Sequence, residues 1–99
     1  MIYISGPITS SDKDEYRKNI KRFSDIQLIL NAQGLDTYNP AIHDELHPDW
    51  TYEQYLVNDI LVIVDQKPDM FFMKKWEQSR GARIEMELAK RFGLKIDFE

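Results

Sequence analysis

The chain has 99 residues, of which 30% are charged and 42% hydrophobic, and its net charge at pH 7 is −4. This length suits one domain with a modest core, spanning residues 1–99, and the acidic balance argues against a nucleic-acid polymer as the ligand. The absence of cysteine excludes disulfides, thiolate catalysis and cysteine-ligated zinc. No apolar run approaches the ~20 residues of a membrane span and no signal peptide precedes the first element, so we expect a cytoplasmic protein without a membrane partner.

The first half of the chain alternates short strands with one long helix. Residues 1–5 are β-branched and aromatic and end at a Gly-Pro pair, which is typical of a central parallel strand. Residues 14–33 carry an apolar stripe with helical spacing, and Gly34 is the expected C-cap. Residues 35–38 predict a second short strand, closed by an Asn-Pro pair.

Residues 41–49 are polar and bounded by prolines, and they predict a loop over the edge of the sheet. His43 and His47 stand four residues apart, as zinc-binding histidines on a helix do. The intervening Asp44 and Glu45 do not match the residue order of the metalloprotease motif. Pro40 and Pro48 argue against a long helix in this segment. A metal role stays open as the weaker alternative to two exposed loop histidines, and we expect neither a metal nor another cofactor.

Residues 51–66 fit two structures. Residues 60–64 alone would pass for a buried strand, whereas the aromatic and aliphatic positions of the whole run recur with helical spacing. The length of the run and the pair Thr51 and Gln54, which is close to a capping box, favour the helix. Asp59 is then an acid on a face that is otherwise aromatic and aliphatic.

The third strand and the last helix follow. Residues 70–73 form an apolar run too short for a helix, which predicts a buried strand. Ser79 is a natural N-cap for a helix that ends near residue 92, and Gly81 leaves the N–H groups of its first turn open to close approach. Residues 94–98 alternate as a final strand.

Glu85 is the unusual residue of that last helix. The face expected to pack on the sheet carries Ala82, Glu85, Leu88, Ala89 and Phe92, whereas the opposite face is rich in charges. A glutamate on the buried side, near a helix N-terminus and a small-residue opening, indicates a function. The alternative, in which Glu85 lies at the edge of the stripe and reaches water, stays open.

The expected element order is strand–helix–strand–helix–strand–helix–strand. Right-handed crossovers make this an α/β fold of the doubly wound, flavodoxin- or Rossmann-like type, with a four-stranded parallel sheet and helices on both faces. In such sheets ligands bind beyond the carboxyl ends of the strands. The segments 5–7 and 76–81 lie at that edge, with Glu85 just behind it.

The chain resembles a known family at positions spread along nearly its whole length. These are residues 2–9, Asn19, Asn39, Pro40, Trp50, Tyr55, Asp59, Asp69 and the segment 76–85. They are similar to the small phage and bacterial members of the nucleoside 2-deoxyribosyltransferase superfamily, which includes the deoxynucleoside 5′-monophosphate N-glycosidases. The most specific parts are the Ser-x-Gly-x-x-x-Glu spacing behind a strand and the N-terminal Tyr-x-x-Gly.

The resemblance implies cleavage of the N-glycosidic bond of a (deoxy)nucleoside or (deoxy)nucleotide. Glu85 matches the catalytic nucleophile, Tyr3 the tyrosine that hydrogen-bonds its carboxylate, and Asp59 the aspartate that assists departure of the base. Water as the acceptor would give hydrolysis and a second base would give transfer, and both stay open. The rival of another class is a non-catalytic nucleotide-binding module, a sensor or a sequestering protein, in which Glu85 grips a ribose hydroxyl.

Other matched positions are implied to bind the substrate. Ser79 and the Gly81 amide match groups that hold the sugar 5′ end or its phosphate, and Gly6 marks where the backbone approaches the ligand. Pro7 and Thr9 stand where the monophosphate glycosidases carry Ser and Arg, and they are closer to the Gly-Pro of the transferases. Trp76 and Tyr55 are candidates for stacking on a base, with core or rim aromatics as the alternative.

We also expect a homo-oligomer, most simply a two-fold dimer in which like helices pack together. Three helices cover two faces of the sheet only thinly, and Phe71, Phe72, Trp76 and Phe92 cluster near one end of the sequence. The resemblance points the same way, to homodimers or larger assemblies in which a neighbour borders each cleft.

Overall fold

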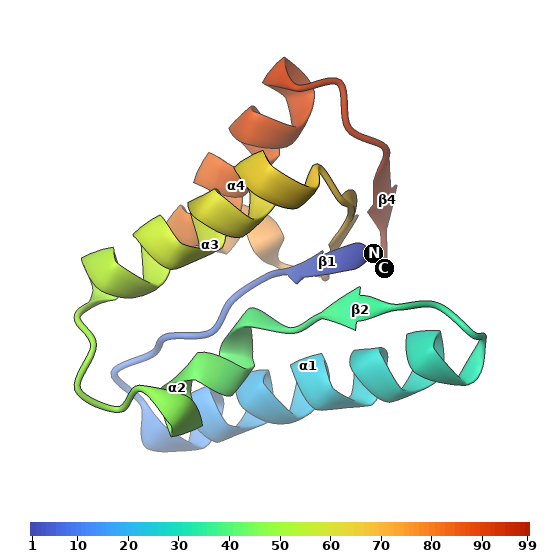
Figure 1. Cartoon of the computed structure of the whole chain (residues 1–99). Helices are drawn as coiled ribbons and strands as arrows, with labels where there is room; N and C mark the ends of the chain where they lie inside the picture. Colours follow the sequence, from blue (N-terminus) through green and yellow to red (C-terminus); the bar gives the residue numbers. More distant parts are fainter.

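The computed structural model describes the backbone of residues 1–99 and the side chains of residues 1–43 and 46–99. Its single sheet runs in the order β2-β1-β3-β4, and every neighbouring pair is parallel (Figure 1). The strands are β1 (Ile2–Ser5), β2 (Thr37–Tyr38), β3 (Asp69–Phe72) and β4 (Ile96–Phe98). The predicted four-stranded parallel α/β fold is therefore confirmed.

Helices cover both faces of the sheet, with α1 on one side and α3 and α4 on the other (Figure 1). The helices are α1 (Lys13–Ala32), α2 (His43–Leu46), α3 (Tyr52–Gln66) and α4 (Arg80–Arg91), joined by the 3₁₀ turns η1 (Pro40–Ile42) and η2 (Trp76–Gln78). The helical interpretation of residues 51–66 is confirmed, and Thr51 and Gln54 form a complete capping box at its start.

The prediction of a loop at residues 41–49 is wrong for most of this segment, because η1 and α2 occupy it as far as Leu46. The Asn39 side chain accepts a hydrogen bond from the backbone N–H of Ala41, and Pro40 opens the turn where its missing N–H costs nothing. Local capping therefore starts a short helical segment that the polar composition and the flanking prolines concealed.

The central strand β1 serves both cores because successive side chains point to opposite faces. Ile4 packs under α1 in an apolar cluster with Phe23 and Met73, whereas Tyr3 belongs to the cluster under α3 and α4. Tyr3, Ile4 and Ser5 are all fully buried. Ser5 shares the face of Tyr3, so the α3–α4 side of β1 carries two hydroxyl groups.

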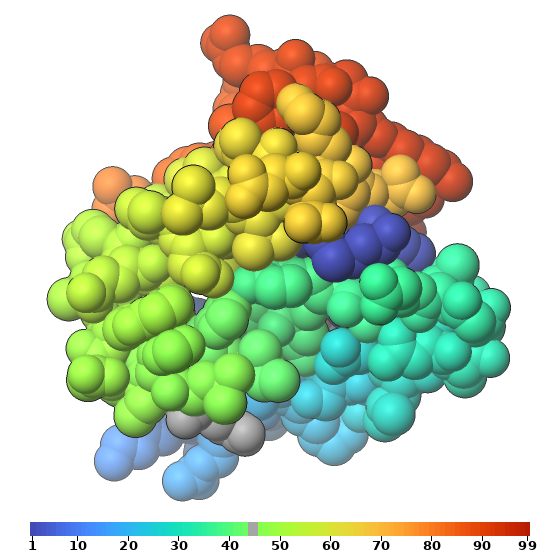
Figure 2. All heavy atoms as spheres, in the orientation of Figure 1, coloured from blue at the N-terminus to red at the C-terminus, as the bar shows by residue number. Residues whose placement is uncertain are grey.

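The exposed aromatic patch expected from Phe71, Phe72, Trp76 and Phe92 does not form as one surface. Phe72 is fully buried, and the Trp76 ring packs against it with the ring centroids 5.4 Å apart. The exposed apolar side chains that line up instead are on α3, where Val57, Leu61 and Val64 recur at helical spacing. Figure 2 shows this segment in yellow-green along the face turned to the viewer.

Candidate functional site

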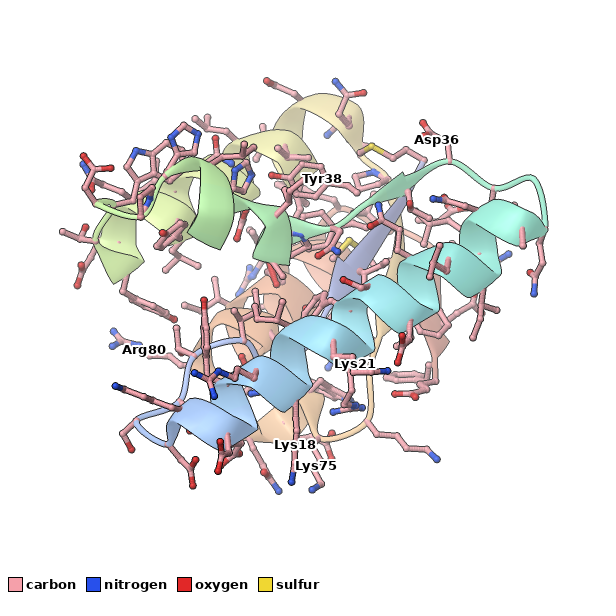
Figure 3. The ribbon with its side chains drawn as sticks, turned by 90° about the horizontal axis from the view of Figure 1, so that it is seen from below. Lys18, Lys21, Asp36, Tyr38, Lys75 and Arg80 are labelled. Atoms are coloured by element: carbon pink, nitrogen blue, oxygen red, sulfur yellow. The ribbon has the colours of Figure 1, made fainter. Side chains whose placement is uncertain are left out.

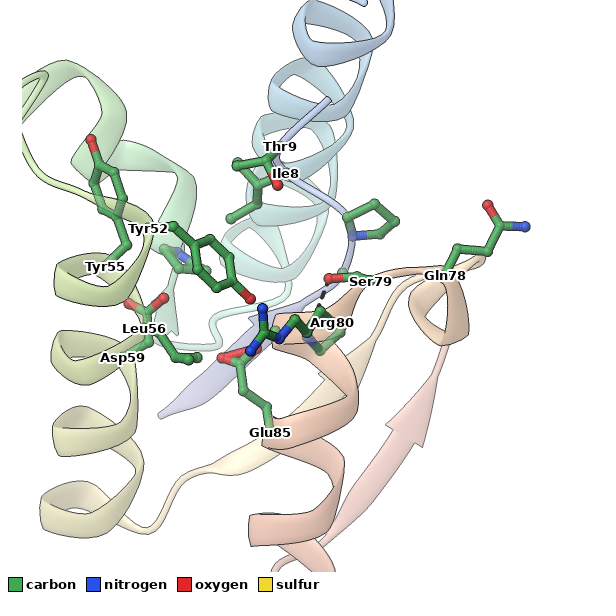
Figure 4. A pocket seen from close by; sticks show the side chains of 15 residues that line it. Ile8, Thr9, Tyr52, Tyr55, Leu56, Asp59, Gln78, Ser79, Arg80 and Glu85 are labelled. Atoms are coloured by element: carbon green, nitrogen blue, oxygen red, sulfur yellow. Dashed lines mark hydrogen bonds between the residues drawn. The ribbon is translucent and has the colours of Figure 1, made fainter. Parts of the chain in front are cut away.

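A cleft of about 420 Å³ opens at the carboxyl ends of the central strands. Its walls come from the loop after β1, from the first half of α3 and from the first turns of α4 (Figure 4). The lining includes seven of the predicted site residues: Gly6, Pro7, Thr9, Asp59, Ser79, Gly81 and Glu85. Parallel strands present this edge to ligands in doubly wound folds, so the cleft lies where a small molecule would bind.

Glu85 is held at the bottom of the cleft by two hydroxyl groups. Its side chain is only 5% exposed. The Tyr3 hydroxyl donates to Oε2 at 2.5 Å, and the Ser5 hydroxyl donates to Oε1 at 2.8 Å. The alternative in which Glu85 reaches water at the edge of its stripe is therefore wrong, and the predicted contact with Tyr3 is present.

The first turn of α4 delivers Glu85 to this position. Ser79 is the N-cap, and its side chain accepts a hydrogen bond from the N–H of Ala82 at 3.2 Å. Ala82, Glu85, Met86 and Ala89 are the buried residues of the helix. The expected packing face is wrong at its end, because Phe92 is 39% exposed under the Lys67 ammonium group whereas Met86 is buried.

Asp59 enters the cleft from α3, opposite Glu85 (Figure 4). Its Oδ1 lies 3.5 Å from the Tyr38 hydroxyl oxygen. Burial and then the nearby charge of Glu85 raise the pKa of Asp59 from 3.8 to about 8. The sequence singled out this acid, and the structure brings it to the same cavity as Glu85.

The two carboxyl groups hold their protons with different strength. Burial raises the pKa of Glu85 from 4.5 to about 7, although the hydrogen bonds from Tyr3 and Ser5 oppose this shift. We infer that Glu85 ionises first, because two hydroxyl donors stabilise its anion and its negative charge then keeps the proton on Asp59. Between about pH 7 and pH 8 the commonest state of the cleft is therefore one carboxylate, Glu85, and one carboxylic acid, Asp59.

Two glycines shape the cleft for different reasons. A Cβ on Gly6 would lie 2.9 Å from the Cβ of Met73, so the close packing of β1 against the end of β3 already requires glycine there. A Cβ on Gly81 would lie 3.4 Å from the Tyr52 hydroxyl oxygen, which forms part of the cleft wall. Gly6 thus has a packing role beside any approach to a ligand.

Two predicted site residues do not line the cleft: Tyr3 is fully buried beneath it, in contact with Glu85, and Trp76 lies away from it. Trp76 lies in η2, and its ring contacts those of Phe72 and Phe98. The centroids of the Trp76 and Phe98 rings are 6.3 Å apart. Trp76 therefore fits the alternative of a core or rim aromatic, since it is partly buried against the α3–α4 core. Tyr55 does line the cleft, and its hydroxyl donates to the His47 carbonyl at 2.5 Å.

Sequence reasoning missed three contributors to the site. The sequence places Ser5 at the ligand-binding edge of the sheet but does not predict its hydrogen bond to Glu85, for which the alternation with Tyr3 was the available signal. Arg80 and Tyr52 line the cleft together, with the guanidinium 5.9 Å from the centre of the Tyr52 ring. The Tyr52 hydroxyl is a buried atom with no hydrogen-bond partner among the described residues, so it can donate to a ligand.

The structure also bears on the histidine pair and on membrane insertion. The His47 ring stacks on Trp50 at a centroid distance of 3.8 Å, and the His43 ring lies 5.7 Å from that of His47. Among the described residues, no group of three or more His, Asp or Glu side chains could hold a metal ion. Within the same described part of the chain, no helix is long and apolar enough to cross a membrane.

Comparison with known proteins gives one family. No curated protein matches the chain. Residues 1–98 match the model of a family described as "Domain of unknown function (DUF4406)", which covers the sheet, all of its helices and every residue of the cleft. The chain therefore belongs to the DUF4406 family.

Proposed function

We propose that the chain cleaves the N-glycosidic bond of a (deoxy)nucleoside or (deoxy)nucleotide, with Glu85 as the nucleophile. One observation carries the proposal: a buried glutamate, held by the Tyr3 and Ser5 hydroxyls, shares a cleft with a second carboxyl group of raised pKa, Asp59. Pairs of acids with separated proton affinities are typical of glycosyl transfer chemistry.

The chemistry proceeds in two displacements. As the C1′–N bond breaks through an oxocarbenium-like state, its electron pair stays on the base nitrogen and a Glu85 oxygen forms a bond to C1′. Asp59 donates its proton to the departing base, which leaves as a neutral molecule. Water, or a second base, then attacks C1′ and restores the Glu85 carboxylate.

The surroundings of each acid suit its role. The Tyr3 and Ser5 hydroxyls donate to Glu85, so they stabilise the anion that must attack. Asp59 stays protonated through neutral pH because of its burial and the charge of Glu85. The same cleft can therefore supply a nucleophile and an acid at one pH, which the reaction requires.

The start of α4 is the proposed binding site for the 5′ end of the sugar. Ser79, Gly81 and Thr9 line the cleft there, together with the guanidinium of Arg80. The N-terminus of a helix and an adjacent cation both favour a negative charge. We therefore expect a 5′-monophosphate to bind more tightly than the corresponding nucleoside.

The deciding experiment is a panel of ribo- and deoxyribonucleosides and their 5′-monophosphates, incubated with the protein at pH 7.5 and analysed by chromatography. Release of free base from at least one compound supports the proposal, and a matching burst of glycosyl-enzyme would identify the covalent step. A compound that binds and stays intact would overturn catalysis in favour of the non-catalytic nucleotide-binding module. If no compound binds or reacts, both assignments fall.

A further inference from the structure

A second hollow, of about 560 Å³, adjoins the cleft and has no part in the mechanism above. It lies between the first half of α1 and the turn that joins β3 to η2, and we call it the α1 groove. Pro7 and Gln78 line both hollows, so the groove continues from the end of the cleft where Ser79 and Arg80 stand. A ligand that fills the cleft can therefore extend into the groove beyond its 5′ end.

We propose that the α1 groove binds the second half of a dinucleotide, in which two nucleosides are joined through their 5′ ends by two phosphate groups. The inference rests on the proposed function, because that function puts the first sugar in the cleft with its 5′ end at the start of α4. The second phosphate and the second nucleoside then lie in the groove. Both hollows have the size of small-molecule sites, which measure about 300–1,000 Å³.

Two lysines make the groove attractive to the second phosphate group. Lys18 extends from α1 and Lys75 from the turn after β3, and both line the groove (Figure 3). Lys75 lies next to the junction with the cleft, since its carbonyl accepts a hydrogen bond from the N–H of Gln78 at 3.1 Å. Among the described residues neither lysine has an ion-pair partner, so both ammonium groups are available to a phosphate.

The third cation of the groove, Arg22, already has partners. Its guanidinium donates to the Glu99 carboxylate at 3.0 Å and to the Lys74 carbonyl at 3.4 Å. The same Glu99 oxygen accepts the N–H of Lys74 at 2.8 Å. These bonds fasten the turn that carries Lys75 to α1, so Arg22 holds the two walls of the groove together.

The groove also carries three carboxyl groups at the start of α1, which argue against a ligand made of phosphates alone. Asp12 is the N-cap, and its side chain accepts the N–H groups of Asp14 and Glu15 at 2.8 and 3.2 Å. Asp14 and Glu15 are exposed, with only an Arg17 contact at 3.8 Å and a Ser10 hydroxyl at 3.4 Å as partners. Carboxylates of this kind accept hydrogen bonds from the hydroxyl groups of a ribose.

The order of these groups along α1 matches the order of groups in a dinucleotide. Asn19, next to Lys18, donates to the Ile8 carbonyl at 3.3 Å, which places this turn of α1 beside the wall of the cleft. Asp14 precedes Lys18 by one helical turn, about 6 Å along the axis. A phosphate bound by Lys18 and Lys75 therefore leaves the sugar that follows it at the level of Asp14 and Glu15.

The test measures the binding of AMP, ADP and diadenosine 5′,5′-diphosphate by titration calorimetry at pH 7.5 and low ionic strength. The three probes add first a phosphate and then a nucleoside to the same nucleotide. ADP should bind about fivefold or more tightly than AMP, because the added phosphate meets two exposed ammonium groups. The dinucleotide should bind at least about threefold more tightly than ADP, through hydrogen bonds to its second ribose.

Variants of exposed residues assign each gain to its part of the groove. Lys18→Gln combined with Lys75→Gln should remove the gain from AMP to ADP and leave the affinity for AMP unchanged. Asp14→Ala combined with Glu15→Ala should remove only the gain from ADP to the dinucleotide. Lys21→Gln is the matched control, because Lys21 lies on the same helix outside the groove and has an ion pair of its own. It should leave all three affinities as in the wild type.

The outcomes separate this inference from the function on which it rests. Equal binding of the three probes by the wild type would overturn it, and so would a dinucleotide that binds no more tightly than ADP. If both gains appear but no compound of the nucleoside and nucleotide panel loses its base, the glycosidic function falls and the dinucleotide site stands. Release of base without the two gains would leave the proposed function in place and refute the groove.

Discussion

The two helical layers of this protein are built in opposite ways. Under α1 the sheet meets an apolar cluster around Phe23, and the outer side of α1 carries ion pairs such as that between Lys21 and Asp25, with N–O distance 2.8 Å. Figure 3 looks at this charged side, with Lys18 and Lys21 labelled. The α3–α4 layer instead buries Glu85 and exposes the apolar side chains of α3.

This contrast separates what stabilises the fold from what the fold is for. The α1 layer buries an apolar cluster and carries ion pairs outside, although Leu28 and Ile29 near the end of the helix are exposed. The α3–α4 layer differs because it buries the carboxyl group of Glu85 and because its exposed apolar side chains, Val57, Leu61 and Val64, line up along α3. Burial of a carboxyl group costs stability, so a need other than stability must maintain it. We infer that the buried Glu85 serves chemistry and that the exposed apolar side chains of α3 serve binding of a partner.

The largest expected effect is on activity, when the buried Glu85 is replaced. Glu85→Gln should lower base release by at least about three powers of ten, because removal of a covalent nucleophile costs that much. The matched control is Glu87→Gln, which changes an exposed glutamate on the outer side of the same helix. Survival of more than about a tenth of the activity in Glu85→Gln would exclude covalent catalysis through this residue.

The second prediction compares the stability of the two layers. Phe23→Ala should lower the free energy of unfolding by about 3–5 kcal/mol, because it empties a fully buried aromatic site under α1. Glu85→Gln should leave this free energy unchanged or raise it, since it removes a buried group whose ionisation is unfavourable. Urea titrations of both variants measure the difference, and a large loss in Glu85→Gln would mark the residue as a structural anchor.

The sequence predicted the helical layers better than it predicted the polar contacts of the cleft. Hydrophobic periodicity places each strand and helix because burial is read from local spacing, and an acid in an apolar stripe marks Glu85 and Asp59. Ser5 and Tyr38 contact the two acids only because distant segments pair in the sheet, which local spacing does not encode. The predicted contact of Trp76 with the substrate fails for a related reason. The sequence does not show whether an aromatic side chain next to the Ser-x-Gly-x-x-x-Glu segment faces the cleft or packs on Phe72.

The third prediction concerns pH, and its sign follows from the same buried acids. The folded-state pKa values of Glu85 and Asp59 are raised above their usual values to about 7 and about 8, so the fold binds protons that the unfolded chain has released. Their stabilising contribution is complete below pH 4 and is lost as pH rises through about 7 and 8. Each group contributes about 1.4 kcal/mol for every pH unit between pH 5 and its folded-state pKa, so urea titrations should show a combined loss of up to about 7 kcal/mol between pH 5 and pH 9.

The paired variants sharpen this pH test. Glu85→Gln and Asp59→Asn should each flatten the decline in stability, whereas Glu87→Gln should leave its slope unchanged because that side chain is exposed. A wild-type stability that stays level from pH 5 to pH 9 would contradict the raised proton affinity of the pair, and with it the division of roles between nucleophile and acid.

The last prediction concerns assembly of the chain through the exposed apolar side chains of α3. Val57, Leu61 and Val64 of α3 are 58%, 55% and 39% exposed, and no charged side chain interrupts this stripe. We propose that a second copy of the chain covers it, because an uncharged apolar stripe is self-complementary across a two-fold axis. A stable dimer of this kind should bury more than about 1,000 Å² in total.

Light scattering at micromolar concentration tests this assembly. The wild type should have about twice the 11.8 kDa of one chain. Leu61→Glu should return it to a monomer, since it places a charge in the middle of the stripe. Leu28→Glu is the matched control, because Leu28 is a still more exposed leucine, at 68%, on the α1 layer. A wild-type mass near that of one chain would refute the dimer, and equal dissociation by both substitutions would show that α3 is not its interface.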